Sequence, residues 1–365
     1  MSEWQACTLS DVLKFGNGKS RPKEYGTIPV YGGNGILDYT NSSNYQDETI
    51  VIGRVGAYCG ATYYEDKQIW VSDNALSAKA LNRNDAKFLY YFLKNLDLNQ
   101  FAQGSSHPLL TQTLLNSIEV VVPSSPLEQK AIASVLSSLD DKIDLFHRQN
   151  KTLEAMAETL FRQWFIEEAK EDWEQATLKD EFSFTMGQSP SGSSFNEDSV
   201  GTPMFQGNAD FGFRFPKERV YTTEPVRFAY PLDTLISVRA PVGAQNMAKV
   251  ECCIGRGVAA FRHAKNPQWY TYTYYKLNQL MNQIKQFNDE GTVFGSISKS
   301  DFERLEVVIP PDEAILAYEQ TAKPLNDKII ANVEQIQTLE NLRDTLLPKL
   351  MSGEVRVQYQ TEEVA

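Results

Sequence analysis

One helix-forming segment occurs twice in this chain, and this repeat constrains the fold more than any other feature. SSLDDKIDLFHRQNKTLEAM covers residues 137–156, and KPLNDKIIANVEQIQTLENL covers residues 323–342. In both segments apolar residues recur at alternating spacings of three and four, the heptad pattern of a coiled coil. A helix of ~35 residues is ~50 Å long. Its apolar stripe needs a partner along that length, and the other copy is the nearest one.

The two heptad seams predict which side chains meet. The predicted coiled-coil interface consists of Leu139, Ile143, Phe146, Asn150, Leu153, Leu160, Leu325, Ile329, Ile336, Leu339 and Leu346. If a pseudo-two-fold axis relates the two halves of the chain, the helices pair antiparallel and hold the two globular domains at opposite ends of a rod. Pro324 is expected to set or kink the start of the second helix, because proline has no backbone N–H. In the alternative, each helix packs along its own domain.

The segments before the two helices also repeat. Trp4 matches Trp173, and several residues that follow them match at the same spacing. Further along, IPVYGGN (28–34) matches TPMFQGN (202–208), and ETIVIGR (48–54) matches DTLISVR (233–239). Short β-branched runs separated by Gly, Asn and Ser are typical of strands joined by turns. Each copy therefore predicts a strand-rich domain with a few short helices, the clearest of them at 88–100 and 269–284.

The predicted fold class is α+β, with two similar strand-rich mixed globular domains and two long helices that pair as an antiparallel coiled coil. The repeat gives the chain an internal pseudo-two-fold symmetry. The predicted divisions are a first globular domain at 1–125, a central helical region at 126–170, a second globular domain at 171–310, a C-terminal helical region at 311–355 and a tail at 356–365.

Composition limits the functional class. The net charge is −12, and the two long strand-rich segments are nearly balanced, so a local basic face is compatible with the sequence but a uniformly basic protein is not. No apolar run approaches the ~18 residues of a membrane helix. The N-terminus lacks the pattern of a signal peptide, so a cytoplasmic location is expected. The four cysteines and three histidines have no metal-ligand spacing, so no metal is expected.

Sequence motifs of catalysis are missing. GNGKS (16–20) resembles the end of a phosphate-binding loop, but the glycine that the motif requires is Leu13. The only Pro-Pro pair, Pro310–Pro311, is followed by Asp312, so the tetrapeptide of an adenine methyltransferase does not occur. There is no GxSxG or HExxH motif. We therefore expect a protein that is not an enzyme, binds no cofactor and has no catalytic residues.

Two similar domains held at a fixed distance suit a long periodic target, and duplex DNA repeats every ~34–36 Å. Arg pairs with guanine, and Asn or Gln with adenine, when loops carry them to base edges. The DNA-binding candidates of the first domain are Lys19, Ser20, Arg21, Tyr31, Asn34, Arg54, Ser105, Ser106, His107 and Thr111. Those of the second domain are Gln188, Ser189, Gln206, Asn208, Arg214, Arg239, Arg256, Thr292, Ser298 and Lys299. Arg54 and Arg239 stand at matched positions in this alignment. For each residue, the alternative is an ordinary turn or surface position, and for the two arginines also a buried ion pair or a phosphate contact.

Over nearly its whole length the sequence resembles the specificity subunit of type I restriction–modification systems. The resemblance rests on the W…LxD…F opening, on GSSHPLLTQTLLNSIEVVVPSSPLEQKAIASVLSSLDDKI and on the closing LENLRDTLLPKLMSGEV. The second copy departs from this pattern at GTVFGSISKSDFERLEVVIPPDEAILAYEQ, which leaves the start of the second helix open.

The resemblance implies that each globular domain reads one half of a bipartite, asymmetric DNA site. It also implies that the helices set the gap of unread base pairs and dock two methyltransferase subunits. These partners use S-adenosylmethionine to methylate adenine N6, and restriction subunits that consume ATP with Mg²⁺ join the complex. Three alternatives stay open: a coiled-coil scaffold with paired protein-binding domains, a fused enzyme, and a subunit that needs a second copy of itself.

Overall fold

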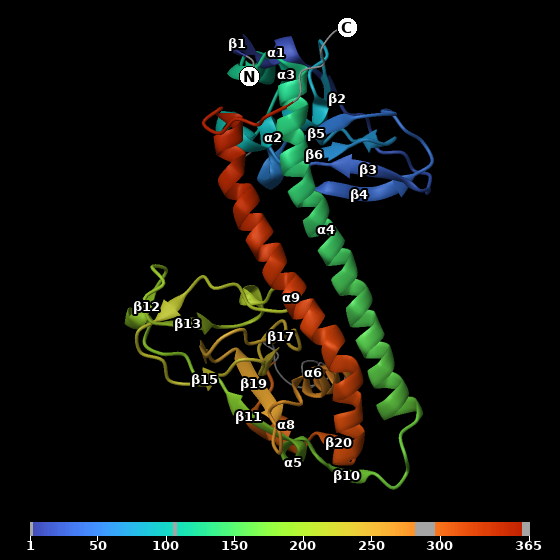
Figure 1. Ribbon diagram of the computed structural model, residues 1–365, viewed down its shortest axis with the longest axis vertical. Helices are drawn as coiled ribbons and strands as arrows, with labels where there is room; N and C mark the ends of the chain where they lie inside the picture. The colour runs from blue at the N-terminus through green and yellow to red at the C-terminus, as the bar shows by residue number, and fades with distance from the viewer. Residues whose placement is uncertain (1–2, 105–107, 282–295, 360–365) are drawn as a thin grey trace. The chain divides into compact units, whose positions relative to one another are not determined.

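The computed structural model describes residues 3–104, 108–281 and 296–359, and the chain divides into two compact units (Figure 1). Unit 1 consists of Met1–Asp144 with Ile336–Ala365, and unit 2 consists of Leu145–Gln335. Each unit therefore combines one strand-rich domain with one segment of each long helix. The predicted α+β fold class is confirmed. The domain limits drawn along the sequence stay predictions.

In unit 1, β1 (Trp4–Thr8) pairs antiparallel with β9 (Glu119–Pro123). The other strands form a four-stranded sheet of order β2-β8-β5-β6 and a three-stranded sheet of order β4-β3-β7. Their bounds are β2 (Leu13–Asn17), β3 (Ile28–Gly32), β4 (Gly35–Thr40), β5 (Thr49–Gly53), β6 (Thr62–Glu65), β7 (Trp70–Val71) and β8 (Ala75–Ala80). The helices that accompany them are α1 (Leu9–Val12), η1 (Gly56–Tyr58), α2 (Ala86–Asn95), η2 (Leu98–Phe101) and α3 (Gln112–Asn116).

Unit 2 has the same plan with more numerous, shorter strands. β10 (Glu174–Thr177) pairs antiparallel with β20 (Glu306–Ile309), and the two sheets have the orders β11-β19-β16-β17 and β12-β14-β13-β18-β15. The strand bounds are β11 (Phe182–Met186), β12 (Phe195–Asn196), β13 (Thr202–Phe205), β14 (Tyr221–Thr222), β15 (Phe228–Ala229), β16 (Thr234–Ser237), β17 (Gln245–Met247), β18 (Cys252–Ile254) and β19 (Val258–His263). The helices are α5 (Leu178–Glu181), η4 (Gly192–Ser194), η5 (Asn208–Asp210), α6 (Tyr270–Gln279) and α8 (Lys299–Arg304).

Matching helix caps show why the two copies fold alike. α1 follows Thr8 and α5 follows Thr177, and both threonines start a capping box. The backbone N–H of Thr8 donates to Asp11 Oδ2 at 2.7 Å, and that of Thr177 donates to Asp180 Oδ2 at 2.9 Å. Each carboxylate satisfies an amide that the first helical turn leaves unpaired.

Two short helices differ from the predicted ranges. The helix expected at 88–100 is interrupted because Asp97 adopts a left-handed conformation, φ 46°, between α2 and η2. Such a conformation ends an α-helix. The helix expected at 269–284 is α6, which ends at Gln279, and the last three residues of the expected range lie outside the described part of the chain.

The long helices are α4 (Pro126–Arg162), continued by a π-helical turn η3 (Gln163–Glu167), and α9 (Asp312–Met351). Pro324, which is expected to set or kink the start of the second helix, does not set the start, because α9 begins at Asp312 and continues through the proline. In unit 1, Asp140 of α4 accepts from Arg343 of α9 at 2.8 Å, and Ile132 and Leu136 share a core with Leu350. The pairing is antiparallel, because residue numbers increase along α4 while those of the contacting residues on α9 decrease.

The same antiparallel pairing occurs in unit 2. Asn332 Nδ2 donates to Asn150 Oδ1 at 2.8 Å, and the Tyr318 hydroxyl donates to the carbonyl of Ala157 at 3.1 Å. Both asparagines are fully buried on the seam. A buried polar pair of this kind favours one register over others, because a shifted register leaves each amide opposite an apolar side chain.

Each unit has its own hydrophobic core. In unit 1, Leu9, Leu76 and Phe88 are fully buried together with Ile132 of α4. In unit 2, Phe161 of α4 packs edge-on against Tyr318 of α9, and their ring centroids are 5.6 Å apart. None of the helices within residues 3–104, 108–281 and 296–359 is long and apolar enough to cross a membrane.

Candidate nucleic-acid interface

In unit 2 a tight turn lies against the ends of two strands, β11 and β13. The turn Gly255–Arg256–Gly257 precedes β19, and the Val258 N–H closes it by donating to the Gly255 carbonyl at 3.0 Å. The Gly255 N–H donates to the Phe205 carbonyl at 2.8 Å, so the turn lies against the loop after β13. A Cβ on Gly187 would lie 2.1 Å from the Gly255 carbonyl oxygen, so only glycine permits the end of β11 to approach this closely.

A hollow of about 920 Å³ lies beside this turn. It contains four of the predicted DNA-binding residues, namely Gln206, Asn208, Arg239 and Arg256. Arg219 also lines it but is paired with Asp210 at 2.5 Å, and Asp210 further accepts from the Gln206 N–H at 2.7 Å. Within the residues that the structure describes, Arg239 and Arg256 form no ion pair, and both are exposed. The hollow therefore offers two available guanidinium groups beside two amide side chains.

Gln188 and Ser189, at the end of β11, lie next to the same turn. The Gln188 N–H donates to the Ile254 carbonyl at 3.0 Å, and Ser189 Oγ accepts from the Arg256 N–H at 3.3 Å. The side chain of Gln188 is exposed, whereas Ser189 is partly buried. Six predicted residues of the second domain are thus gathered at one site.

Two other predicted residues of the second domain, Arg214 and Ser298, have structural roles. Arg214 has no exposed surface: it pairs with Glu154 of α4 at 3.0 Å and lies over the Tyr274 ring at 4.0 Å, so it is not available to a base edge. Ser298 caps α8, with its Oγ donating to Asp301 at 2.7 Å. Lys299 is exposed and pairs with Glu303 at 3.3 Å. Thr292 lies outside the described residues.

Unit 1 places an equivalent turn at the corresponding site. Ser72–Asp73–Asn74 precedes β8, and the Ala75 N–H donates to the Ser72 carbonyl at 3.0 Å. The Ser72 N–H donates to the Tyr31 carbonyl at 2.9 Å, and the Lys19 N–H donates to the Val71 carbonyl at 3.0 Å. Lys19 and Ser20 are exposed beside this turn, as is Asn34 in the β3–β4 connection.

A hollow of about 680 Å³ includes this turn of unit 1. Arg21 lines it and lies 3.6 Å from Asp38, and the two side chains are 53% and 39% exposed. Tyr25, which is 82% exposed, and Lys23 line the same hollow. Apart from the matched turn, the residues that line the two hollows differ.

Two further predicted residues of the first domain, Tyr31 and Thr111, are less accessible. Tyr31 is buried and donates to Glu65 at 3.2 Å; burial, together with this carboxylate, raises the pKa of Tyr31, so the hydroxyl stays protonated. Thr111 caps α3, accepting from the Leu114 N–H at 3.2 Å. Ser105, Ser106 and His107 lie outside the described residues.

The sequence alignment of Arg54 with Arg239 is wrong by one residue. In the strand ladders Gly53 faces Ala75, and Ser237 faces Val258. The carbonyl of Arg54 accepts from the Leu110 N–H at 3.0 Å, and the equivalent Val238 carbonyl accepts from the Ile297 N–H at 3.0 Å.

The shift by one residue explains why Arg54 has a buried Nε while Arg239 is exposed. A shift of one residue turns a strand side chain to the opposite face. Accordingly Arg54 Nε is buried, with no hydrogen-bond partner among the described residues, while Arg239 is exposed at the position equivalent to Val55.

The sequence reasoning missed Asp73, Asn74 and Tyr25. The segments SDN and GRG share no residue type, so only the hydrogen bonds of the two turns align Asp73 with Arg256. The one available signal for Tyr25 is its place in a polar, glycine- and proline-containing loop, where an aromatic side chain has little apolar surface to pack against.

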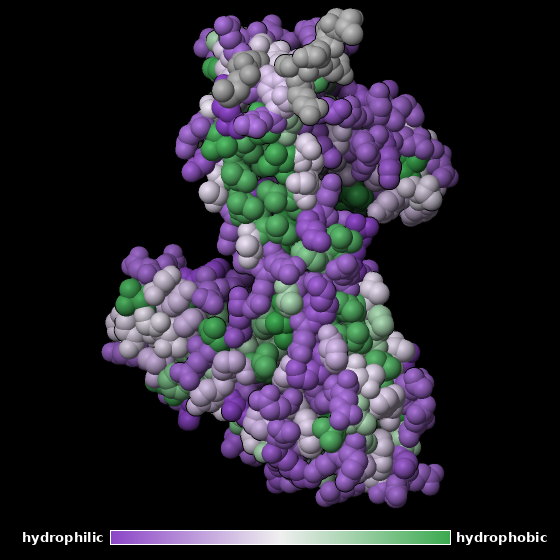
Figure 2. Space-filling view, in the orientation of Figure 1, coloured by the Kyte–Doolittle hydropathy of each residue, from purple (hydrophilic) through white to green (hydrophobic). Residues whose placement is uncertain are grey.

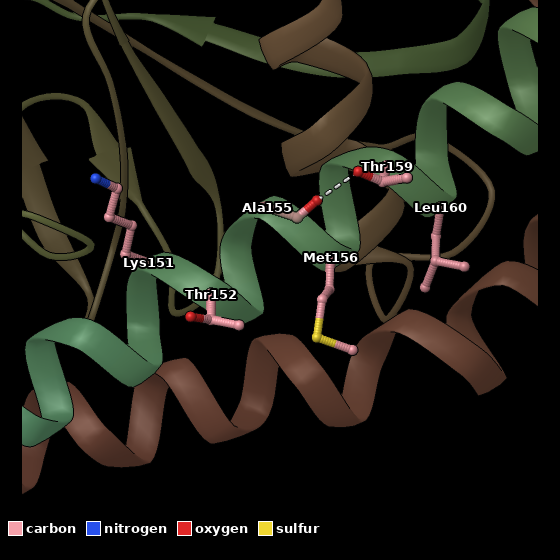
Figure 3. Close-up of a pocket in the computed structure, with 6 residues that line it drawn as sticks. All are labelled: Lys151, Thr152, Ala155, Met156, Thr159 and Leu160. Atoms are coloured by element: carbon pink, nitrogen blue, oxygen red, sulfur yellow. Dashed lines mark hydrogen bonds between the residues drawn. The ribbon is translucent and has the colours of Figure 1, made fainter.

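A second surface lies on the long helices. An apolar hollow of about 610 Å³ in unit 2 is lined by the α4 residues Lys151, Thr152, Ala155, Met156, Thr159 and Leu160. Figure 3 shows Thr152, Met156 and Leu160 extending from one side of the helix, with Lys151 on another side. Met156 is 49% exposed. Thr159 Oγ1 donates to the Ala155 carbonyl at 2.8 Å, so this hydroxyl is satisfied within the helix.

Three of the six residues that line this hollow, Thr152, Thr159 and Leu160, recur on α9 in unit 1 as Thr338, Thr345 and Leu346. TLEAMAETL (152–160) and TLENLRDTL (338–346) match at both threonines, the leucines and the glutamate. Leu342 stands where α4 has Met156 and is 44% exposed, and Thr345 Oγ1 donates to the Asn341 carbonyl at 2.8 Å as Thr159 does. Figure 2 shows apolar side chains gathered on the visible face over the α4 and α9 segments of this unit. Exposed apolar residues that repeat at matched positions indicate a contact surface more than chance exposure does.

The fold and these sites define a class of protein: two similar strand-rich domains, each with a polar loop site, combined with paired long helices. A family model described as the type I restriction modification DNA specificity domain matches residues 1–155 and 170–343. The chain belongs to this family.

Individual relatives agree with this assignment. A Methanocaldococcus jannaschii protein described, under the name MjaX, as a putative type I restriction enzyme specificity subunit is 31% identical over 297 residues, which cover 76% of this chain and 70% of the relative. The MjaIX specificity subunit of the same organism is 26% identical over 308 residues, 75% of this chain and 70% of that relative. The crystal structure of a type I restriction–modification S subunit from M. genitalium has a TM-score of 0.71 at 19% identity, with 99% of this chain and 97% of that one covered, and so has the same fold.

Proposed function

We propose that this chain is the DNA sequence-specificity subunit of a type I restriction–modification complex, in which each strand-rich domain reads one half of a bipartite, asymmetric duplex site. The observation that carries the proposal is the pair of equivalent loop sites. They share one backbone arrangement but present different side chains, Lys19 and Asp73 in unit 1 against Gln188 and Arg256 in unit 2. Equivalent backbones with diverged polar side chains suit two readers of different sequences.

The chain is proposed to be non-catalytic and to bind no cofactor of its own. In this proposal two methyltransferase subunits methylate adenine N6 with S-adenosylmethionine, and restriction subunits carry out the reactions that depend on ATP and Mg²⁺. Among the described residues no three His, Cys, Asp or Glu side chains lie together as metal ligands do. The net charge of −12 suits a subunit whose partners supply much of the contact with DNA phosphates.

Binding to a randomised duplex library tests this function. The full-length chain, purified with its methyltransferase, is expected to select a motif of two short sequences separated by unread base pairs. Competition with an unrelated duplex distinguishes specific from non-specific binding, which is typically 10³- to 10⁷-fold weaker. Selection of no sequence, with equal displacement by any duplex, would instead favour the scaffold whose paired domains bind proteins.

The repeated helix surfaces are the proposed docking sites for two methyltransferase subunits. Met156→Glu or Leu342→Glu is expected to remove one of two bound subunits, and the double variant both. Loss of a central apolar anchor weakens an interface by about 30- to 1,000-fold. Native mass spectrometry of the complex counts the subunits.

Leu145→Glu provides a matched control. Leu145 is also on α4 and 37% exposed, but its counterpart on α9 is Ala331, so its large apolar side chain is not repeated. This variant should keep both subunits. If the double variant also keeps both, the methyltransferases dock elsewhere.

A further inference from the structure

The turn before β8 in unit 1 and the turn before β19 in unit 2 have the same pattern of backbone hydrogen bonds. Each is closed by an N–H donating to the carbonyl three residues earlier, at 3.0 Å in both. Each is held to the strand β3 or β13 through the bonds from Ser72 to Tyr31 and from Gly255 to Phe205. A third bond, from Lys19 to Val71 and from Gln188 to Ile254, is 3.0 Å long in both units. These bonds place Asp73 and Arg256 at equivalent positions of the two turns.

That position is rigid and open. Glycines hold the neighbouring strand end against the turn, since a Cβ on Gly18 would meet the Ser72 carbonyl oxygen at 1.7 Å, as one on Gly187 would meet that of Gly255 at 2.1 Å. Asp73 and Arg256 are the first central residues of their turns, and both are exposed at the edge of a hollow. A side chain placed on a rigid element keeps the geometry that a specific contact needs.

The two side chains have opposite hydrogen-bonding character. Arg256 carries a fork of donors and forms no ion pair with the described residues, so it matches the O6 and N7 acceptors of guanine. Asp73 carries acceptors only, so it matches the N4 amino group of cytosine. Arg21 and Lys23 line the same hollow and are the residues there that can face the phosphates, but Glu24 and Asp38 line it too, and Arg21 lies 3.6 Å from Asp38.

Resting on the proposed function, we infer that this shared turn position determines one base of each half-site: Arg256 specifies a guanine in one half, and Asp73 specifies a cytosine in the other. The assignment identifies which of the polar side chains at each loop site reads a base edge. Neighbours such as Lys19 and Arg21 position the DNA through its backbone.

Selection from the randomised duplex library, with the full chain in its methyltransferase complex, tests this assignment. Arg256→Ala is expected to abolish the preference for guanine at a single position of one half-site, reducing discrimination there by about 5- to 150-fold. Arg256→Lys keeps the charge but not the fork, so it should restore affinity without restoring the preference. Asp73→Asn should relax a cytosine preference in the other half only.

Matched controls exclude effects of charge alone. Arg227→Ala and Asp66→Asn remove exposed charges of the same sign from the same units outside the hollows, and both should keep the wild-type motif. A uniform loss of affinity for all sequences in Arg256→Ala would make Arg256 a phosphate contact and overturn the assignment. So would unchanged preferences in both turn variants alongside a split wild-type motif. A wild-type complex that selects no motif would refute the proposed function itself.

Discussion

Deleting residues 145–151 together with residues 331–337 is expected to shorten the unread gap between the two half-motifs by about three base pairs. Seven helical residues span ~10.5 Å at 1.5 Å per residue, and successive base pairs are ~3.4 Å apart. The prediction follows from the proposal that the long helices set the spacing between the two readers. The bases read in each half should stay the same, because neither loop site includes a deleted residue.

The two deleted windows are matched to the observed pairing. After deletion, Ile143 precedes Leu153 by three positions and Ile329 precedes Leu339 by three, so the alternation of three and four continues. The contacts of the helices with each domain are kept, namely Asp140 with Tyr91 at 2.6 Å and Glu154 with Arg214 at 3.0 Å.

A length-preserving control is needed because the deletion also removes the buried Asn150–Asn332 pair. Replacing both asparagines by leucine keeps every residue between the domains, and an apolar pair can substitute for a buried polar pair without loss of stability. This variant should show the wild-type gap. An unchanged gap in the deletion variant, with both half-motifs still read, would show that the helices do not set the spacing.

Exchanging the first globular domain is expected to have the second large effect, the replacement of one half-motif and no other change. Residues 1–125 of a relative would be grafted with Trp4 and Tyr91 retained. Tyr91 donates to Asp140 of α4, and Trp4 packs beside Gly353, so both connect the domain to the helical segments of unit 1. The graft should fold because these contacts are independent of the loop site.

Much of the architecture was predictable from the sequence because it depends on local patterns. The heptad spacing indicated the seam on which Asn150 and Asn332 meet, and the repeat that starts at Trp4 and Trp173 indicated two similar domains. The continuation of α9 through Pro324 was not predictable, since a proline inside a helix costs stability that only tertiary packing offsets. Tyr318, fully buried against Phe161, lies in the part of α9 that precedes Pro324 and holds it in the core.

The loop sites were predictable only in part, because they depend on contacts between segments distant in sequence. Asn34 and Asn208 align correctly, since their strands β3 and β13 pair in the same register with β7 and β18. Arg214 follows a glycine-rich loop and has the appearance of a surface residue in the sequence. It is buried because Glu154, 60 positions earlier, pairs with it. Unequal loop lengths likewise shifted the alignment of Arg54 by one residue.

Genome-wide mapping of modified adenines, in cells that express the chain with its methyltransferase, tests the central claim most directly. For the wild-type chain the map should give a split motif with two different halves. For the chain with an exchanged first domain, one half should change while the other half and the gap stay the same. A single uninterrupted motif, or a change of both halves after the one exchange, would contradict the account of two independent readers in one chain.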